Sequence, residues 1–132
     1  MLLVDTNVLV DVLQNDPQWA DWSVAQMRAQ AKLHVLAINP VIYAEISLSF
    51  STLEALDDVV LTMALEIREI PRPALFLAAK AYAQYRRRGG SKEQVLPDFF
   101  IGAHAAVEGW PLLTRDASRF RTYFPTLEVI TP

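Results

Sequence analysis

The sequence predicts one α/β domain with a parallel sheet, and two observations support this fold class. Short apolar runs alternate with longer segments of helical periodicity along the chain of 132 residues, as in parallel sheets with helices on both faces. Hydrophobic residues make up 52% of the chain and charged residues 20%, which supplies one core and argues against disorder. No repeat, low-complexity tract or linker is visible, so we expect residues 1–132 to form a single domain.

The first strand and the two helices after it follow from local apolar patterns. Residues 2–4 form a short apolar run of the β type. The segment that begins at residue 6 carries two apolar pairs at the i, i+4 spacing of a helix. Pro17 then opens a second helix, which we expect to extend to about residue 32.

The second strand is expected at 33–38, where an apolar run precedes a helix start. Asn39 is a favoured N-cap and Pro40 suits the first helical position, so a helix is predicted from there to about residue 50. A Ser-Thr pair at 51–52 then caps a further helix, which carries an acidic residue near its first turn.

The second half of the chain is predicted to contain three strands and three helices. A basic cluster followed by two glycines ends the first of these helices, and Gly109 ends the second. The predicted elements are a half-exposed strand at 65–70, a long helix from the prolines at 71 and 73 to the arginines at 86–88, a loop at 89–97, a helix at 98–108, a strand at 111–114, a short helix at 117–120 and a strand at 128–130.

Charge and composition exclude several classes of protein. The net charge is -3, and an acidic chain is a poor general binder of nucleic acid, so any such contact needs a local basic patch. The absence of cysteine excludes disulfides and thiolate metal sites. No apolar run approaches the roughly 20 residues of a membrane span, and Asp5 comes too early for a signal peptide. We therefore expect a cytoplasmic protein.

Four acidic residues stand out because of where they fall in this pattern: Asp5, Glu45, Asp98 and Asp116. Asp5 and Asp116 follow the carboxyl ends of predicted strands, where ligands of parallel sheets bind, and Asp98 opens a helix. A second explanation exists for each of these three. Asp5 and Asp98 also suit helix caps or charges near a helix N-terminus, and Asp116 suits the first turn of the short helix.

Glu45 is the hardest of the four to explain without a site. It shares a helical stripe with Val41, Ile42 and Leu48, and its helix contains no lysine or arginine. A lone carboxylate in apolar surroundings is costly unless something pairs with it. The alternative is a surface position, since the same helix carries two serines.

A divalent metal ion is the natural partner for such a set of carboxylates. Hard oxygen ligands suit Mg²⁺ or Mn²⁺, and a bound ion lowers the pKa of water and stabilises charge on a phosphodiester. A metal-dependent phosphodiesterase of this kind needs no serine, cysteine or histidine nucleophile. We therefore expect His34 and His104 to be structural or exposed.

The four acidic motifs resemble those of PIN-domain ribonucleases. The matching segments are LLVDTNVLVDVL with Asp5, YAEI with Glu45, LPDFFIGAHA with Asp98 and LLTRDASRF with Asp116. The short length and the C-terminal segment RDASRFRTYFPTLEVITP are most similar to VapC-type toxins of type II toxin–antitoxin pairs. The resemblance extends from Leu3 to Ile130, and four motifs in the expected order are more specific than any one of them.

The resemblance implies a three-layer α/β/α fold with a central parallel sheet of about five short strands, and Mg²⁺- or Mn²⁺-dependent cleavage of RNA. The catalytic, metal-holding carboxylates would be Asp5, Glu45, Asp98 and Asp116. Asp5 and Asp98 would be the most direct ligands, while Thr6, Asn7 and Thr114 would support the site. The resemblance also implies a homodimer and a cognate antitoxin that blocks the site.

An RNA substrate also requires positive charge near the site. One basic cluster consists of residues 86–88 with Lys92, and a second consists of Arg115, Arg119 and Arg121. Both are equally explained as solvated surface, and arginines at a helix C-terminus are favourable in themselves. We expect Arg115, beside Asp116, to be the best candidate for RNA contact, with Arg86 from the first cluster.

Two other functions stay open at this point. A phosphatase of the same fold class would form an aspartyl-phosphate on Asp5, but the motif Asp-Thr-Asn lacks a second aspartate two residues on. A non-catalytic binding module would keep the carboxylates as helix caps only. Affinity for Mg²⁺ or Mn²⁺ distinguishes this module from an enzyme.

Overall fold

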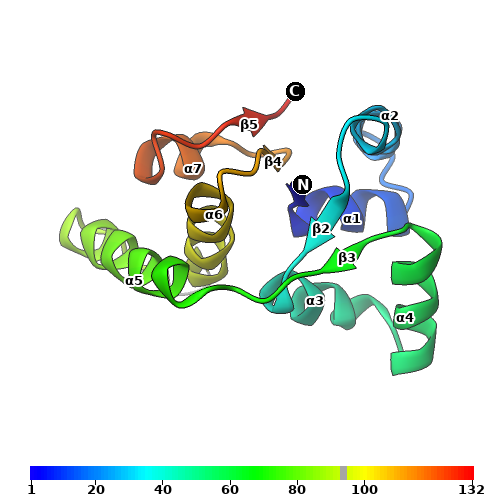
Figure 1. Cartoon of the computed structure of the whole chain (residues 1–132), viewed down its shortest axis with the longest axis horizontal. Helices are drawn as coiled ribbons and strands as arrows, with labels where there is room; N and C mark the ends of the chain where they lie inside the picture. The colour runs from blue at the N-terminus through cyan, green and yellow to red at the C-terminus, as the bar shows by residue number, and fades with distance from the viewer. Residues whose placement is uncertain (93–94) are drawn as a thin grey trace.

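A five-stranded parallel sheet lies at the centre of the computed structural model, which describes residues 1–92 and 95–132 (Figure 1). Its order is β3-β2-β1-β4-β5, and each neighbouring pair runs parallel. The predicted α/β class with about five short strands is thus confirmed. The strands are β1 (Leu2–Val4), β2 (Leu36–Ile38), β3 (Glu66–Ile67), β4 (Leu112–Leu113) and β5 (Val129–Ile130).

The helices alternate with the strands in the predicted order. Asn39 caps its helix by accepting from the backbone N–H of Ile42, and Thr52 caps the next by accepting from Ala55. Gly109, at φ 70°, ends a helix in the left-handed conformation. The helices are α1 (Thr6–Leu13), α2 (Ala20–Ala31), α3 (Pro40–Ile46), the 3-10 turn η1 (Ser47–Ser49), α4 (Leu53–Thr62), α5 (Arg72–Arg87), α6 (Leu96–Glu108) and α7 (Ser118–Tyr123).

Several predicted boundaries were wrong by a few residues. Helix α2 begins three residues after Pro17, because Asp16 Oδ1 accepts from the backbone N–H groups of Gln18 and Trp19 and closes a turn there. Helix α6 begins at Leu96, so Asp98 lies in its first turn and does not open it. Part of the loop predicted at 89–97, residues 93–94, lies outside the described residues.

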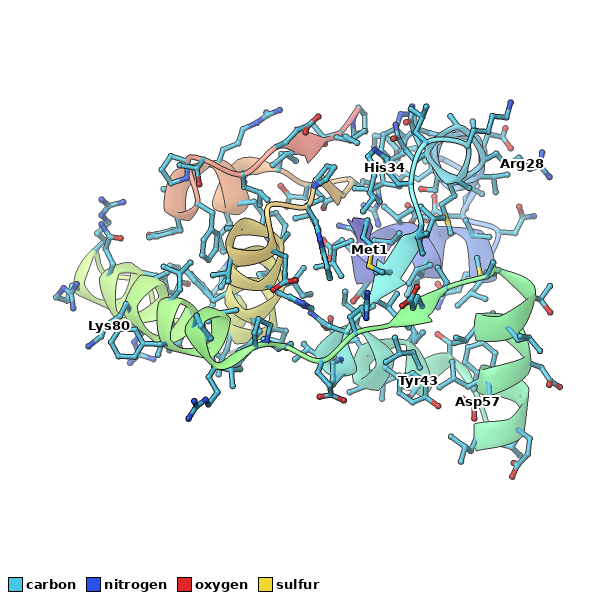
Figure 2. All side chains as sticks on the ribbon, in the orientation of Figure 1. Met1, Arg28, His34, Tyr43, Asp57 and Lys80 are labelled. Carbon is cyan, nitrogen blue, oxygen red and sulfur yellow. The ribbon has the colours of Figure 1, made fainter. Side chains whose placement is uncertain are left out.

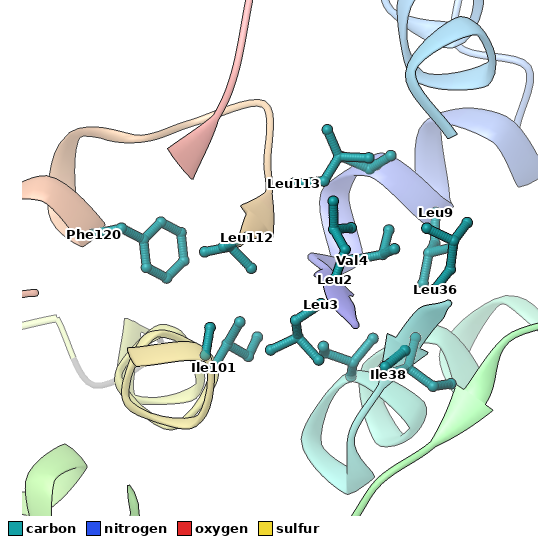
Figure 3. Close-up of a cluster of buried hydrophobic side chains, with 14 of the residues drawn as sticks. Leu2, Leu3, Val4, Leu9, Leu36, Ile38, Ile101, Leu112, Leu113 and Phe120 are labelled. Atoms are coloured by element: carbon teal, nitrogen blue, oxygen red, sulfur yellow. The ribbon is translucent and has the colours of Figure 1, made fainter. Parts of the chain in front are cut away.

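The core forms on both faces of the sheet. Successive side chains of a strand point to opposite faces, so Leu2 and Val4 project to one side of β1 and Leu3 to the other. In Figure 3, α1 carries Leu9 beside Val4, whereas α6 carries Ile101 beside Leu3. All five of these side chains are at most 1% exposed. Helices on both faces of the sheet give the three layers that the sequence predicted.

Polar contacts join the outer helices. The Tyr43 hydroxyl on α3 donates to Asp57 Oδ1 on α4 at 2.7 Å, and the two side chains lie next to one another in Figure 2. His104 is fully buried on α6, with Nδ1 3.2 Å from Asn39 Nδ2 and its ring 5.1 Å from that of Trp110. These contacts give His104 the structural role that the sequence predicted. No helix in the described residues is long and apolar enough to cross a membrane.

The strand order places a topological switch point beside β1. The chain runs from β1 outward to β2 and β3, and then returns to β4 on the other side of β1. Val4 pairs with Leu113 in the β1–β4 register, so Asp5 and Thr114 follow side by side at the carboxyl ends. Ligands of open parallel sheets bind at such a point, which directs attention to these two residues.

Candidate functional site

Asp5 is anchored at the switch point by two hydrogen bonds. Its Oδ1 accepts from the backbone N–H of Thr6 at 2.8 Å, which makes it the N-cap of α1. Its Oδ2 accepts from the Thr114 hydroxyl at 2.8 Å. Asp5 is 4% exposed and Thr114 fully buried. The cap explanation is therefore correct for Asp5, but it accounts for one carboxylate oxygen and leaves the other directed at a second strand end.

Glu45 is brought to the same place by α3. It is half-buried, and its Oε1 accepts from the Thr6 hydroxyl at 2.6 Å. The stripe predicted around Glu45 was wrong at Leu48, which lies beyond the end of α3 and is 91% exposed. The partner that the α3 sequence could not supply is thus a hydroxyl from α1. The neighbouring Asn7 donates to Thr114 Oγ1 at 3.3 Å.

Asp98 and Asp116 complete the acidic set from α6 and the segment after β4. Asp98 Oδ2 accepts from Arg119 Nη1 on α7 at 2.6 Å, and both side chains are about 30% exposed (31% and 29%). Asp116 is exposed, and its Oδ1 accepts from the Ser118 hydroxyl at 3.2 Å. Both residues therefore have protein side chains as partners in addition to their place near the switch point.

Burial and mutual repulsion raise the pKa of three of the carboxyl groups. Burial raises the pKa of Asp5 to about 7, and the charges of Asp98 and Glu45 add to it, against the hydrogen bonds from Thr114 and Thr6. Burial also raises the pKa of Glu45, with a contribution from Asp98. The pKa of Asp98 is raised by burial against the opposing effect of the nearby arginine. The acidic groups therefore lie within electrostatic reach of each other.

Asp5, Glu45 and Asp98 line a hollow of about 280 Å³, whereas Asp116 is not among the described residues that line it. It is lined by Asp5, Thr6, Asn7, Val10, Glu45, Asp98 and Arg115. A larger hollow of about 420 Å³ lies between α1, α2 and α4, but mostly apolar side chains line it and it contains no carboxylate. The smaller hollow is therefore the better candidate for polar chemistry.

The donor set of the smaller hollow fits a divalent cation. It consists of carboxylate and hydroxyl oxygens, the ligands that Mg²⁺ and Mn²⁺ prefer, and a cation would offset the burial and the neighbouring charges that raise the pKa of Asp5. In the described part of the chain, however, no three carboxyl groups lie close enough to hold one metal ion together. Asp98 is turned to Arg119 and Glu45 to Thr6, so these side chains would have to reorient around an ion.

Arg115 stands at the edge of the hollow in a network that the sequence interpretation did not include. Its Nε and Nη2 donate to the two carboxylate oxygens of Asp11 at 2.8 and 3.1 Å. Asp11 lies on α1 between two valines and is 2% exposed. Its helix contains no lysine or arginine, so the signal that drew attention to Glu45 would also have found Asp11.

Arg86, the second arginine predicted to contact RNA, is not brought to the hollow. It lies in the last turn of α5, where its Nη1 is 3.4 Å from the Tyr82 hydroxyl. The residues that line the hollow do not include it. RNA contact by Arg86 therefore stays a prediction from the sequence.

Residues 2–124 match the PIN domain family. This match confirms the resemblance and the fold that the sequence motifs predicted. No curated protein matches the chain by sequence.

Solved structures share the fold over nearly the whole chain. VapBC2 from Rickettsia felis bound to a DNA fragment from its promoter superposes with a TM-score of 0.76 at 21% identity, covering 99% of this chain and 98% of that chain. DNA-bound VapBC from Salmonella typhimurium gives 0.71 at 21% identity, with coverage of 99% and 98%. A toxin–antitoxin complex from Klebsiella pneumoniae gives 0.67 at 20% identity, with coverage of 100% and 98%. At these identities the similarity establishes the fold alone.

Proposed function

The chain belongs to the PIN domain family, and from this premise we propose that it is a metal-dependent endoribonuclease and the toxin of a toxin–antitoxin pair. The observation that carries the proposal is the gathering of Asp5, Glu45 and Asp98 around one hollow at the β1–β4 switch point. Three separate elements supply these carboxylates. A fold that needed them only as caps or surface charges would have no reason to bring them together.

Asp5 and Asp98 would be the most direct ligands of Mg²⁺ or Mn²⁺, with Glu45 and Asp116 beside them. When bound, the ion would supply Lewis acidity toward the phosphodiester and toward water. The residues around the ion have their own tasks. Thr114 and the backbone N–H of Thr6 hold both oxygens of Asp5 in place, which fixes a ligand before the ion arrives.

Glu45 is suited to accept a proton during hydrolysis. Its raised pKa makes it a better base than an exposed carboxylate, and Oε1 already accepts from a hydroxyl at 2.6 Å. Asn7 donates to Thr114 and accepts from the backbone N–H of Arg115 at 3.2 Å. These amide contacts keep the two strand ends in register around the hollow.

Other chains are the expected partners. The similar structures from Rickettsia felis and Klebsiella pneumoniae are a VapBC pair and a toxin–antitoxin complex, which supports a cognate antitoxin for this chain. Leucines that are 91%, 80% and 75% exposed, at positions 48, 61 and 33, offer apolar surface to an antitoxin or to a second copy in a homodimer.

The test is cleavage of a labelled single-stranded RNA by the purified protein with Mg²⁺ or Mn²⁺ and with EDTA. Activity should require the metal and fall at least about a hundredfold in Asp5→Asn and Asp98→Asn, since even outer-shell partners of metal sites cost about 10–100-fold. Asp58→Asn removes an exposed carboxylate from α4 and should leave activity unchanged. Full activity in both site variants would exclude the proposal.

A non-catalytic PIN-like module is the second candidate. One observation favours it, because Glu45 and Asp98 each have a partner of their own and the described carboxyl groups are not assembled for one ion. Calorimetric titration with Mn²⁺ separates the two functions. Saturable binding that disappears in Asp98→Asn supports the nuclease, and the absence of binding supports the module.

A further inference from the structure

Asp11 is a buried carboxylate that accepts its side-chain hydrogen bonds from Arg115 and Ser23. Both of its oxygens accept from the Arg115 guanidinium, and Oδ2 also accepts from the Ser23 hydroxyl on α2 at 3.0 Å. At 2% exposure, Asp11 is among the most buried charged groups described. Its helix α1 begins at the Asp5 cap, so Asp11 and Asp5 belong to one continuous element.

Arg115 is fixed by more than this ion pair. Its backbone N–H donates to Asn7 Oδ1 at 3.2 Å, and its guanidinium carbon lies over the ring of Trp19, 5.6 Å from the ring centre. The side chain is still 31% exposed and lines the hollow beside Asp5 and Glu45. Arg115 is therefore held by several contacts in a position that reaches both solvent and the hollow.

The geometry of the ion pair leaves a defined set of donors. A guanidinium has five N–H groups, and Asp11 takes one from Nε and one from Nη2. Three N–H groups are left, two on Nη1 and one on Nη2. The described residues supply no hydrogen-bond acceptor for Nη1. The three N–H groups form the planar end of the group, which matches two oxygens of a phosphate.

A purely structural role does not explain the choice of this pair. Replacing a buried ion pair by apolar side chains is often neutral or stabilising, so a link between α1 and the segment after β4 needs no charge. A polyanion that approaches the hollow meets three carboxylates, so a positive side chain at the rim, in addition to any bound metal ion, would favour its approach. The second arginine nearby, Arg119, is paired with Asp98, and Arg115 is the arginine among the described lining residues.

We propose that Arg115 binds a phosphate of single-stranded RNA at the rim of the hollow, and that Asp11 is the positioning residue that aims it. The inference rests on the proposed nuclease function and names how that site takes its substrate. Trp19 and Asn7 also hold Arg115 in place. Trp19 contacts its guanidinium, and Asn7 accepts from its backbone N–H. The ligand is the phosphodiester backbone, so binding depends on salt and little on sequence.

The direction in which Asp11→Asn changes the affinity for RNA distinguishes a positioning role of Asp11 from a general effect of net charge. Asp11→Asn removes a negative charge near a polyanion, so if only net charge counted the variant would bind RNA more tightly. If Asp11 aims Arg115, the same change weakens binding. Asp21→Asn on α2 makes the same change of charge at an exposed position with no contact to Arg115, and serves as the matched control.

The experiment measures binding of a short fluorescein-labelled single-stranded RNA of mixed sequence by anisotropy in Mg²⁺. Every protein carries Asp5→Asn, so that the RNA survives. Asp11→Asn should weaken binding about tenfold, the effect of losing one well-placed charge-assisted hydrogen bond, and Asp21→Asn should not. Arg115→Lys keeps a charge beside Asp11 but lacks the planar fork, and should weaken binding by a similar factor.

Combining the changes completes the test. In the Arg115→Lys background, Asp11→Asn should cause no further loss, because the group that it positions is already gone. Equal or tighter binding by Asp11→Asn would overturn the inference. If circular dichroism shows that Asp11→Asn does not fold, the affinity of Arg115→Lys for the RNA is the deciding measurement. An unchanged affinity of this variant would overturn the inference. Absence of both RNA binding and RNA cleavage in wild type would instead refute the nuclease proposal on which the inference rests.

Discussion

Replacing Asp5 by asparagine should make the metal-free protein more stable, although it should destroy the proposed activity. Asp5 is 4% exposed and lies near the charges of Asp98 and Glu45. Asparagine removes the charge and keeps the shape. Its amide oxygen can still accept from the backbone N–H of Thr6, and its amide nitrogen can donate to Thr114 Oγ1. The variant therefore loses an electrostatic penalty without leaving a buried polar group unpaired.

The size of the effect follows from the pKa of Asp5. Burial and its neighbours raise this pKa from 3.8 to about 7, and each unit corresponds to about 1.36 kcal/mol. A rise of about three units therefore corresponds to about 4 kcal/mol. The folded protein binds the Asp5 proton more tightly than the unfolded chain, so the free energy of unfolding falls as pH rises from about 4 to 7 and the loss is complete above that.

Urea unfolding in EDTA, followed by circular dichroism at several pH values, measures this difference. Wild type and Asp5→Asn should have similar free energies of unfolding near pH 4. By about pH 8 the variant should be more stable by up to about 4 kcal/mol, a large part of the roughly 5–15 kcal/mol typical of a domain. Asp21→Asn, at an exposed position, should follow wild type at every pH.

The reasoning fails if the difference between Asp5→Asn and wild type does not grow with pH. It also fails if wild type is the more stable protein at pH 8 in EDTA. Either result would mean that the charge of Asp5 is compensated in the folded state without a metal. Such compensation would remove the main physical reason for placing a cation in this hollow.

Two further predictions concern the neighbours of the site. Arg119→Gln removes the guanidinium that pairs with Asp98, so calorimetry should show Mn²⁺ binding about tenfold tighter, a factor that corresponds to about 1.4 kcal/mol. The control Arg121→Gln, at an exposed position, should leave the affinity for Mn²⁺ unchanged. Unaltered affinity in Arg119→Gln would show that the ion does not compete with this arginine. Gly102→Ala should lower the free energy of unfolding by about 1–3 kcal/mol through overpacking, because its Cβ would lie 2.5 Å from the Phe124 ring; urea denaturation checks this, and wild-type stability would mean that the ring can move aside.

The sequence predicted which residues meet at the switch point because these residues lie at junctions between elements. Asp5 follows the first strand, β1, and Thr114 follows β4, the strand that pairs with it. The local sequence pattern, together with the rule that ligands bind at the carboxyl ends of parallel strands, was therefore sufficient. Helix ends were predictable for the same reason, as at Asn39 and Gly109, where cap chemistry depends on a few adjacent residues. These features are local, and a single sequence carries them in full.

The partners of the charged groups were not predictable because they come from distant parts of the chain. Glu45 was expected to need a partner from outside its own helix, which has no cation, and a hydroxyl 39 residues away donates to it. Arg115 lies 104 residues from Asp11 and Arg119 lies 21 residues from Asp98. Patterns along the chain identify which carboxylates are unusual, while only the fold decides which cation each one meets.

The two arginine–aspartate ion pairs near the hollow suggest different uses of the same chemistry. Asp11 is 2% exposed and binds Arg115 through both oxygens, so opening this pair would strand a buried charge. Asp98 meets Arg119 through one nitrogen, with both side chains about 30% exposed, so this pair can open at little cost. The Asp11 pair is suited to hold the Arg115 guanidinium in place. The Asp98 pair is suited to open, so that its carboxylate can bind an incoming cation. Because such a cation also offsets the burial and the neighbouring charges that raise the pKa of Asp5, its binding should add to the stability of the folded state. The proposed activity and the stability should then rise together with metal concentration.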